Sequence, residues 1–121
     1  MKYLLLIYHD EQRFGEMTEA QVQAMYGEYG KLREQLISQG KFINGSQLQA
    51  TTTAASVRVR DGKDLVTDGP FAETHEQLGG YFLVEADSRE EAVAIAKQIP
   101  SARMGTIEVR AQVERAAEAN A

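Results

Sequence analysis

Lys2-Tyr3-Leu4-Leu5-Leu6-Ile7-Tyr8 is the stretch that decides the fold, because it is apolar at nearly every position. Short runs of aromatic and branched residues like this one are typical of a strand that is buried on both faces. Tyr81-Phe82-Leu83-Val84-Glu85-Ala86 repeats the pattern in the second half of the chain. Other parts of the structure must therefore cover both sides of these two strands.

A helix is predicted after each of the two buried strands. Thr18 and Gln21 form a capping-box pattern, and apolar residues then recur every three or four positions up to Gly40. This stripe consists of Val22, Met25, Tyr26, Tyr29, Leu32, Leu36 and Ile37. Gly27 and Gly30 each weaken the helix interior by about 1 kcal/mol relative to alanine, so we expect them to mark a close packing contact.

The second helix begins at Ser88, which forms a capping box with Glu91, and Pro100 ends it. Its apolar stripe consists of Ala92, Ile95, Ala96 and Ile99. Two further strands are predicted, over residues 42–48, with a bulge or break in the middle, and over residues 106–110. Each predicted helix therefore lies between two predicted strands.

A hairpin interrupts this arrangement in the middle of the chain. Residues 56–60 alternate apolar and polar side chains, Asp61-Gly62 is a turn signal, and residues 65–67 return. We expect one face of the hairpin to be exposed. A tight turn at residues 68–71 and a polar loop up to Gly79-Gly80 follow. The order strand, helix, strand, hairpin, strand, helix, strand is a doubled β-α-β unit of the α+β class.

Helices can cover only one face of such a sheet, although both buried strands offer apolar side chains to both faces. A partner must cover the second face. We therefore expect a homodimer in which two sheets pack face to face around a twofold axis.

Composition fits a single domain and excludes several kinds of function. The chain has 121 residues, of which 43% are hydrophobic, and its formal net charge of -5 offers no basic field to nucleic acid. The longest apolar run is too short for a membrane span and no signal-peptide cleavage site follows it, so we expect a cytoplasmic protein. Cysteine is absent, and neither a metal-binding spacing nor a phosphate or dinucleotide motif occurs. We expect no metal and no cofactor.

Residues 65–74, Leu-Val-Thr-Asp-Gly-Pro-Phe-Ala-Glu-Thr, and residues 76–81, Glu-Gln-Leu-Gly-Gly-Tyr, resemble the signature of the DGPF branch of the YCII-related family. Further similarities lie in residues 2–8, 57–63 and 99–110. The resemblance covers residues 1–113 as one domain and leaves residues 114–121 as a tail. It implies a ferredoxin-like βαββαβ protomer with an inserted hairpin and an antiparallel sheet, assembled into a dimeric α/β barrel.

About function the resemblance implies less. One relative removes chloride from a chlorinated hydroxyhydroquinone, and others occur beside extracytoplasmic-function sigma factors. In the wider family a strand-end aspartate and a histidine on the first helix are proposed to transfer protons. Asp10 matches the aspartate, whereas Tyr29 stands at the position of the histidine, so the pair is incomplete in this chain.

Other candidate residues follow from their chemistry. His9 suits acid-base work near neutral pH, but consecutive strand residues point to opposite faces, so it forms no direct dyad with Asp10. Asp68 is a candidate base on a turn that we expect beside the core, although it can equally stabilise the turn through its own backbone. Glu73 and Tyr8 are predicted substrate-binding residues. Arg103 joins them because its guanidinium can bind a carboxylate or phenolate.

Two functions stay open for this chain. The first is an enzyme that eliminates from or isomerises a small hydroxylated or aromatic substrate in the barrel cleft, with Asp10 or Asp68 as base and His9 or Tyr29 assisting. The second is a non-catalytic, ligand-sensing or regulatory dimer that is linked to a sigma factor. The missing helical histidine favours the second.

Overall fold

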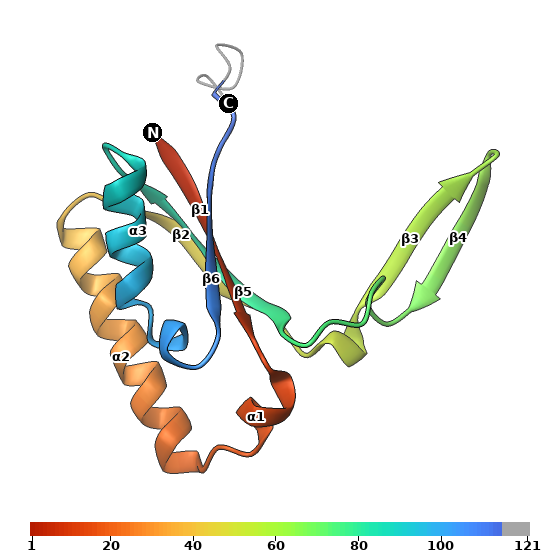
Figure 1. Cartoon of the computed structure of the whole chain (residues 1–121), viewed down its shortest axis with the longest axis horizontal. Helices are drawn as coiled ribbons and strands as arrows, with labels where there is room; N and C mark the ends of the chain where they lie inside the picture. The colour runs from red at the N-terminus through yellow and green to blue at the C-terminus, as the bar shows by residue number, and fades with distance from the viewer. Residues whose placement is uncertain (115–121) are drawn as a thin grey trace.

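A computed structural model describes residues 1–114 as an antiparallel sheet covered by helices on one face (Figure 1). The four strands, in the spatial order β2-β5-β1-β6, are β2 (Phe42–Gln47), β5 (Gln77–Glu85), β1 (Lys2–His9) and β6 (Thr106–Ala111). Helices α2 (Glu19–Ser38) and α3 (Arg89–Gln98) cover the same face of the sheet (Figure 1). The predicted element order and α+β class are confirmed, and they are consistent with a ferredoxin-like fold.

The two strands that are apolar on both faces form the centre of the sheet. Leu5 of β1 pairs with Phe82 of β5 on one side and with Val109 of β6 on the other. Leu5 is fully buried and faces the helices. The alternate side chains of the same strands, such as Leu4 and Leu6, lie on the other face and are half-buried.

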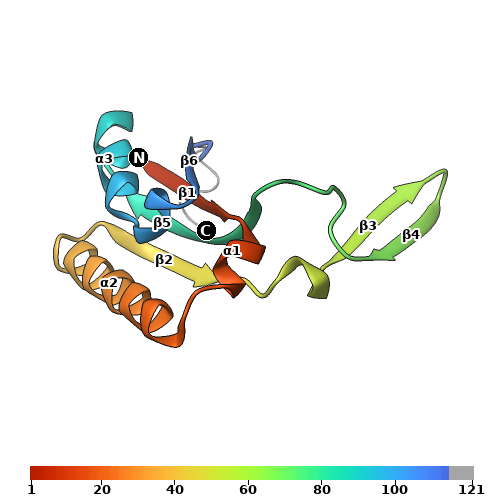
Figure 2. The same ribbon diagram turned by 60° about the horizontal axis from the view of Figure 1, so that its bottom comes forward.

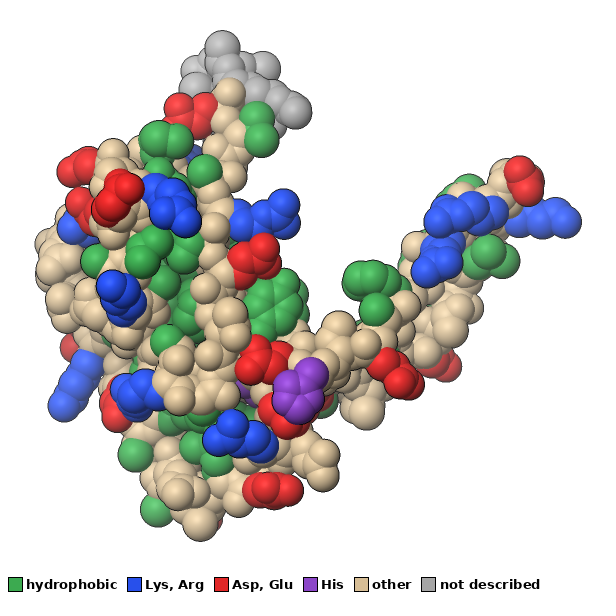
Figure 3. All heavy atoms as spheres, viewed as in Figure 1, with side chains coloured by type: hydrophobic (Ala, Val, Ile, Leu, Met, Phe, Trp, Pro, Cys, Tyr) green, Lys and Arg blue, Asp and Glu red, His purple; other side chains and the backbone are tan. Residues whose placement is uncertain are grey.

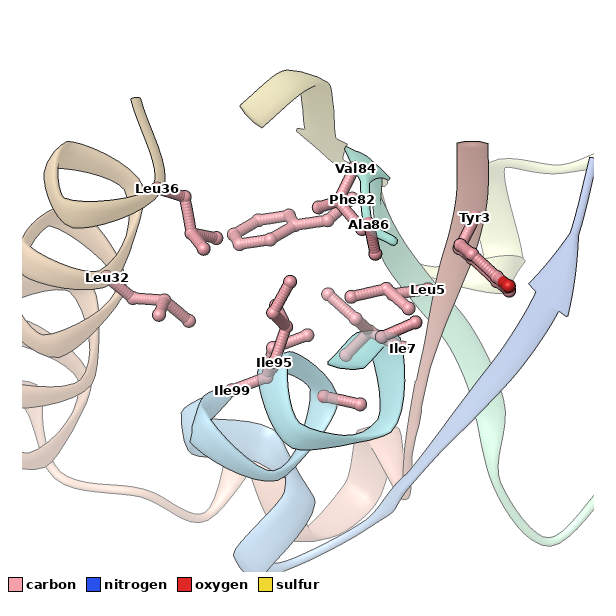
Figure 4. Close-up of a cluster of buried hydrophobic side chains, with 12 residues drawn as sticks. Tyr3, Leu5, Ile7, Leu32, Leu36, Phe82, Val84, Ala86, Ile95 and Ile99 are labelled. Carbon is pink, nitrogen blue, oxygen red and sulfur yellow. The ribbon is translucent and has the colours of Figure 1, made fainter. Parts of the chain in front are cut away.

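The core lies between this sheet and the two helices (Figure 4). Its side chains come from β1, β5, α2 and α3, and include Leu32, Leu36, Ile95 and Ile99. The predicted stripe of α2 is only partly correct, since Tyr26 is 42% exposed and Ile37 is 56% exposed. The buried side of the stripe consists of Met25, Leu32 and Leu36.

The ends of α2 follow the sequence signals, whereas its interior glycines do not. The Gln21 N–H donates to Thr18 Oγ1 at 3.1 Å and the Thr18 N–H donates to Gln21 Oε1 at 2.9 Å, which confirms the capping box. Gly40 adopts a φ of 71° after the last turn. A Cβ on Gly27 or Gly30 would meet no atom within 4 Å, so the predicted close packing contact is wrong.

The inserted hairpin consists of β3 (Ala55–Arg60) and β4 (Lys63–Asp68), which pair only with each other. This β3–β4 arm points away from the sheet and helices (Figures 1 and 2). The expectation of one buried face is wrong, since Val57, Val59 and Val66 are 66%, 57% and 66% exposed. Hydrophobic and basic side chains lie along the arm in Figure 3.

Hydrogen bonds hold the base of the arm against α1 (Glu11–Gly15), a short helix that the sequence analysis did not predict. The Thr51 N–H, in the short 3-10 helix Thr51–Thr53, donates to both carboxylate oxygens of Glu11 at 3.1 Å. Gln77 accepts from the Glu11 N–H at 2.9 Å and donates to the Thr74 carbonyl at 2.5 Å. Both ends of the arm are thereby tied to the end of β1.

The sheet face opposite the helices is apolar along its centre. Leu6 pairs with Tyr81 and Leu4 pairs with Leu83, and Tyr8 extends the same row. No element of residues 1–114 packs over these half-buried side chains. We call these five residues, Leu4, Leu6, Tyr8, Tyr81 and Leu83, the free sheet face.

None of the described helices is both long and apolar enough to span a membrane.

Candidate functional site

A cavity of about 340 Å³ lies between α2 and the sheet, at the end of β1 that carries His9. Its wall is formed by Ile7, His9, Phe14, Met25, Tyr26, Tyr29, Arg33, Ser46, Gln47, Gly79, Gly80, Phe82 and Ser101. This His9 cavity opens on the helical side of the sheet. It therefore lies on the opposite side from the face that would line a dimeric barrel.

Two glycines of β5 make room for the cavity. Ile7 pairs with Gly80 and Tyr8 with Leu78, so Gly79 is an extra residue that forms a bulge. A Cβ on Gly79 would overlap the His9 ring, and one on Gly80 would lie 2.7 Å from the Ser46 carbonyl oxygen. The bulge also lets β5 begin at Gln77, which corrects the prediction of a loop up to Gly79-Gly80.

His9 enters the cavity as the last residue of β1. Its ring packs against the Phe14 ring of α1, with centroids 5.1 Å apart. The side chain is half-buried and still reaches the open space of the cavity. An imidazole in this position can accept or donate a proton.

Tyr29 and Ser101 contribute a pair of hydroxyl groups to the same wall. Their oxygens are 2.6 Å apart and share a hydrogen bond, and Ser101 is only 5% exposed. Burial raises the pKa of the Tyr29 hydroxyl, although the hydrogen bond with Ser101 acts in the opposite direction. The hydroxyl therefore keeps its proton near neutral pH and can donate a hydrogen bond.

The cavity contains polar residues that the sequence analysis missed. The Arg33 guanidinium lies 6.0 Å from the centroid of the Phe42 ring, and Gln47 Nε2 donates to the Tyr26 hydroxyl at 3.3 Å. Tyr26, Tyr29 and Arg33 follow one another at spacings of three and four residues on α2. That helical spacing was a usable signal, because it places all three on one side of the helix.

Asp10 does not reach the His9 cavity. It caps α1, since its Oδ1 accepts from the Gln12 N–H at 2.9 Å. It lines a separate, open cleft of about 370 Å³ together with Glu11, Thr51 and His75. The structure therefore separates Asp10 from Tyr29, and the expectation that Asp10 and His9 form no dyad agrees with their placement on different hollows.

Tyr8 and Arg103 also lie outside the cavity. The Tyr8 hydroxyl is on the free sheet face, where it donates to Glu108 Oε1 at 3.3 Å, and partial burial followed by the Glu108 charge raises its pKa. Arg103, in the short 3-10 helix Pro100–Arg103, pairs with Glu28 at 2.5 Å and is 66% exposed. Its charge is therefore paired with the Glu28 carboxylate on the surface of α2.

Asp68 and Glu73 are exposed residues of the arm and of the segment that follows it. The expectation that they lie beside the core is wrong, because β4 belongs to the arm, which points away from the sheet instead of packing on it. Of the seven predicted site residues, only His9 and Tyr29 meet at one cavity. Within residues 1–114, no three His, Cys, Asp or Glu side chains are grouped as metal ligands.

The chain matches known proteins over nearly its whole length. The model of the YCII-related domain matches residues 1–115. An uncharacterised protein of Rhizobium meliloti (strain 1021) is 33% identical over 112 residues, which make up 91% of this chain and 90% of that relative. The chain therefore belongs to the family of proteins with a YCII-related domain.

Proposed function

We propose that the His9 cavity binds a small hydroxylated or aromatic molecule and that His9 transfers a proton on it. The observation that carries this proposal is the composition of the wall, in which one imidazole and four hydroxyl-bearing side chains meet apolar side chains. Ligand cavities commonly combine an apolar lining with a few converging polar groups. The volume of about 340 Å³ is near the lower end of the range for such cavities.

An elimination or isomerisation is the reaction type that this wall supports best. Such a reaction needs a proton taken from one atom and delivered to another atom or to the leaving group. His9 can do both, and the protonated Tyr29 hydroxyl can stabilise a developing oxyanion. Asp10 has no part in this proposal, since its carboxylate caps α1.

A second candidate function is ligand sensing without turnover. The use of Asp10 as a helix cap favours it, because the acidic partner that the family resemblance implied is absent from the cavity wall. Both functions require the same ligand-binding event. They differ in whether product forms when the bound molecule is incubated with the protein.

A thermal-shift screen against single-ring phenols, hydroxylated aromatics and carboxylic acids tests the binding step. A compound present at 100 times its dissociation constant should stabilise the protein by about 2.7 kcal/mol. His9→Asn should weaken binding of the best compound by about tenfold, which is the effect of losing one polar contact. Isothermal titration of both proteins measures this ratio.

His75→Asn is the matched control for this experiment. His75 is exposed and lies in the Asp10 cleft, so its replacement should leave the affinity unchanged. If no compound in the screen stabilised the protein, the result would count against the cavity as a binding site. Equal affinity of the His9 variant and the parent would count against the assigned role of His9.

The proposal includes a homodimer that forms through the free sheet face, giving the dimeric α/β barrel that the resemblance implied. Its support is the row of half-buried apolar side chains on the side without helices. Glu108 and Arg110 stand on the β6 side of this row, so the margin carries both signs of charge. A twofold axis can pair such a surface with itself.

Light scattering during gel filtration should give a mass of twice 13.4 kDa at micromolar concentration. Leu6→Lys should reduce it to 13.4 kDa, because a charge would be buried between the two sheets. Gln23→Lys, an exposed position of helix α2 on the other side of the sheet, should leave the dimer intact. A monomeric parent protein would contradict the proposed assembly.

A further inference from the structure

We infer that the ligand of the His9 cavity is an anion and that Arg33 recognises its negative charge. The inference rests on the proposed binding site and specifies the class of molecule that this site takes. We assign a small aromatic carboxylate, with a single ring, as the chemistry that fits best.

The charged side chains of the cavity wall are all basic. Arg33 and His9 are the residues of the wall that can carry a positive charge, and no Asp or Glu belongs to the wall. Arg33 is an exposed residue that lines an open cavity, so its charge attracts anions there and leaves neutral molecules unaffected.

Arg33 has no carboxylate partner among residues 1–114. Glu28 of α2 is paired with Arg103 at 2.5 Å, and no ion pair to Arg33 occurs in the described part of the chain. The contact with the Phe42 ring holds the guanidinium near the cavity without neutralising it. Its five N–H donors remain suited to a carboxylate, which a guanidinium binds through two parallel hydrogen bonds.

The apolar part of the wall defines the rest of the ligand. Phe14, Met25 and Phe82 surround the space beside His9, and aromatic rings pack favourably against such side chains. A cavity of about 340 Å³ accommodates one ring with a short substituent more readily than a fused or extended system. Hydroxyl substituents would find partners in Tyr26, Tyr29 and Ser101.

Benzoate, benzamide and benzyl alcohol share one ring, but only benzoate is an anion. Comparing them separates the effect of charge from the effect of shape. In isothermal titration we expect benzoate to bind the parent protein at least tenfold more tightly than benzamide. Arg33→Gln should abolish this preference, and Arg33→Lys should restore part of it, because lysine keeps the charge but loses the fork of donors. Rising salt should weaken benzoate and leave benzamide unchanged.

Arg103→Gln is the matched control, since this exposed arginine interacts with the same helix but does not line the cavity. It should leave the preference for benzoate intact, and the thermal midpoint of each variant verifies that it is folded. Equal binding of benzoate and benzamide to the parent would overturn the anion inference while supporting the cavity. Binding of neutral hydroxylated rings alone would also overturn it. Failure of all charged and neutral rings would remove the binding site itself.

Discussion

Gly105→Ala is expected to lower the free energy of unfolding by about 3 kcal/mol, the upper part of the range for overpacked sites. A Cβ on Gly105 would overlap the Tyr8 carbonyl oxygen and approach the His9 Cα to 3.1 Å. These are backbone atoms of the central strand, so they cannot move aside as a flexible side chain can. Urea unfolding followed by circular dichroism measures the loss.

Gly27→Ala provides a control of opposite sign. Gly27 lies in α2 where an added Cβ would meet nothing within 4 Å, so alanine should stabilise the protein by about 0.5 to 1 kcal/mol through helix propensity. Equal losses of stability in both alanine variants would contradict the close approach of Gly105 to the β1 backbone. Gly105 also contacts the cavity wall, because its N–H donates to the carbonyl of Ser101 at 2.8 Å.

Leu36→Ala is expected to cost about 3 kcal/mol, within the range of about 2 to 5 for buried leucines. Leu36 is 1% exposed and belongs to the cluster that joins α2 to β5 and α3. Truncation would remove buried methyl groups and leave a hollow, because the surrounding strands and helices can relax only partly. The change would appear as a lower denaturant midpoint with an unchanged slope.

The neighbouring residue supplies the comparison for this prediction. Ile37 is 56% exposed, so Ile37→Ala should change stability by less than about 0.5 kcal/mol. A large loss at Ile37 would show that this side of α2 is covered in solution. It would then restore the wider stripe that the sequence predicted.

Much of the fold could be predicted because the sequence signals are local. Continuous apolar runs marked β1 and β5, and the Thr18 capping box marked the start of α2. The hairpin turn at Asp61-Gly62 was also correct, since both residues have positive φ angles. What periodicity could not give was the direction of the arm, because alternation of side chains does not reveal whether any surface lies against them.

The candidate site was predicted less well, for physical reasons that particular residues illustrate. His9 was found from its acid-base chemistry near a strand end, and Tyr29 because it stands where the family resemblance implies a histidine. Arg33 was missed because a lone arginine on a helix is ordinarily a surface residue, and its contact with Phe42 joins separate elements. Asp10 was expected at the active site, but its side chain caps the short helix α1 instead. The DGPF branch and the link to a sigma factor stay predictions.

The arm leaves and rejoins the sheet at neighbouring strands, and this has a consequence for how such proteins can evolve. The Leu48 N–H donates to the Gly79 carbonyl at 2.8 Å, so the two ends of the segment that carries the arm are adjacent. The entropy cost of closing such a loop grows only slowly with its length. Insertions and deletions between these two residues can therefore accumulate without changing the register of β2 and β5. Natural selection can vary the outer extension while the sheet beneath it stays the same.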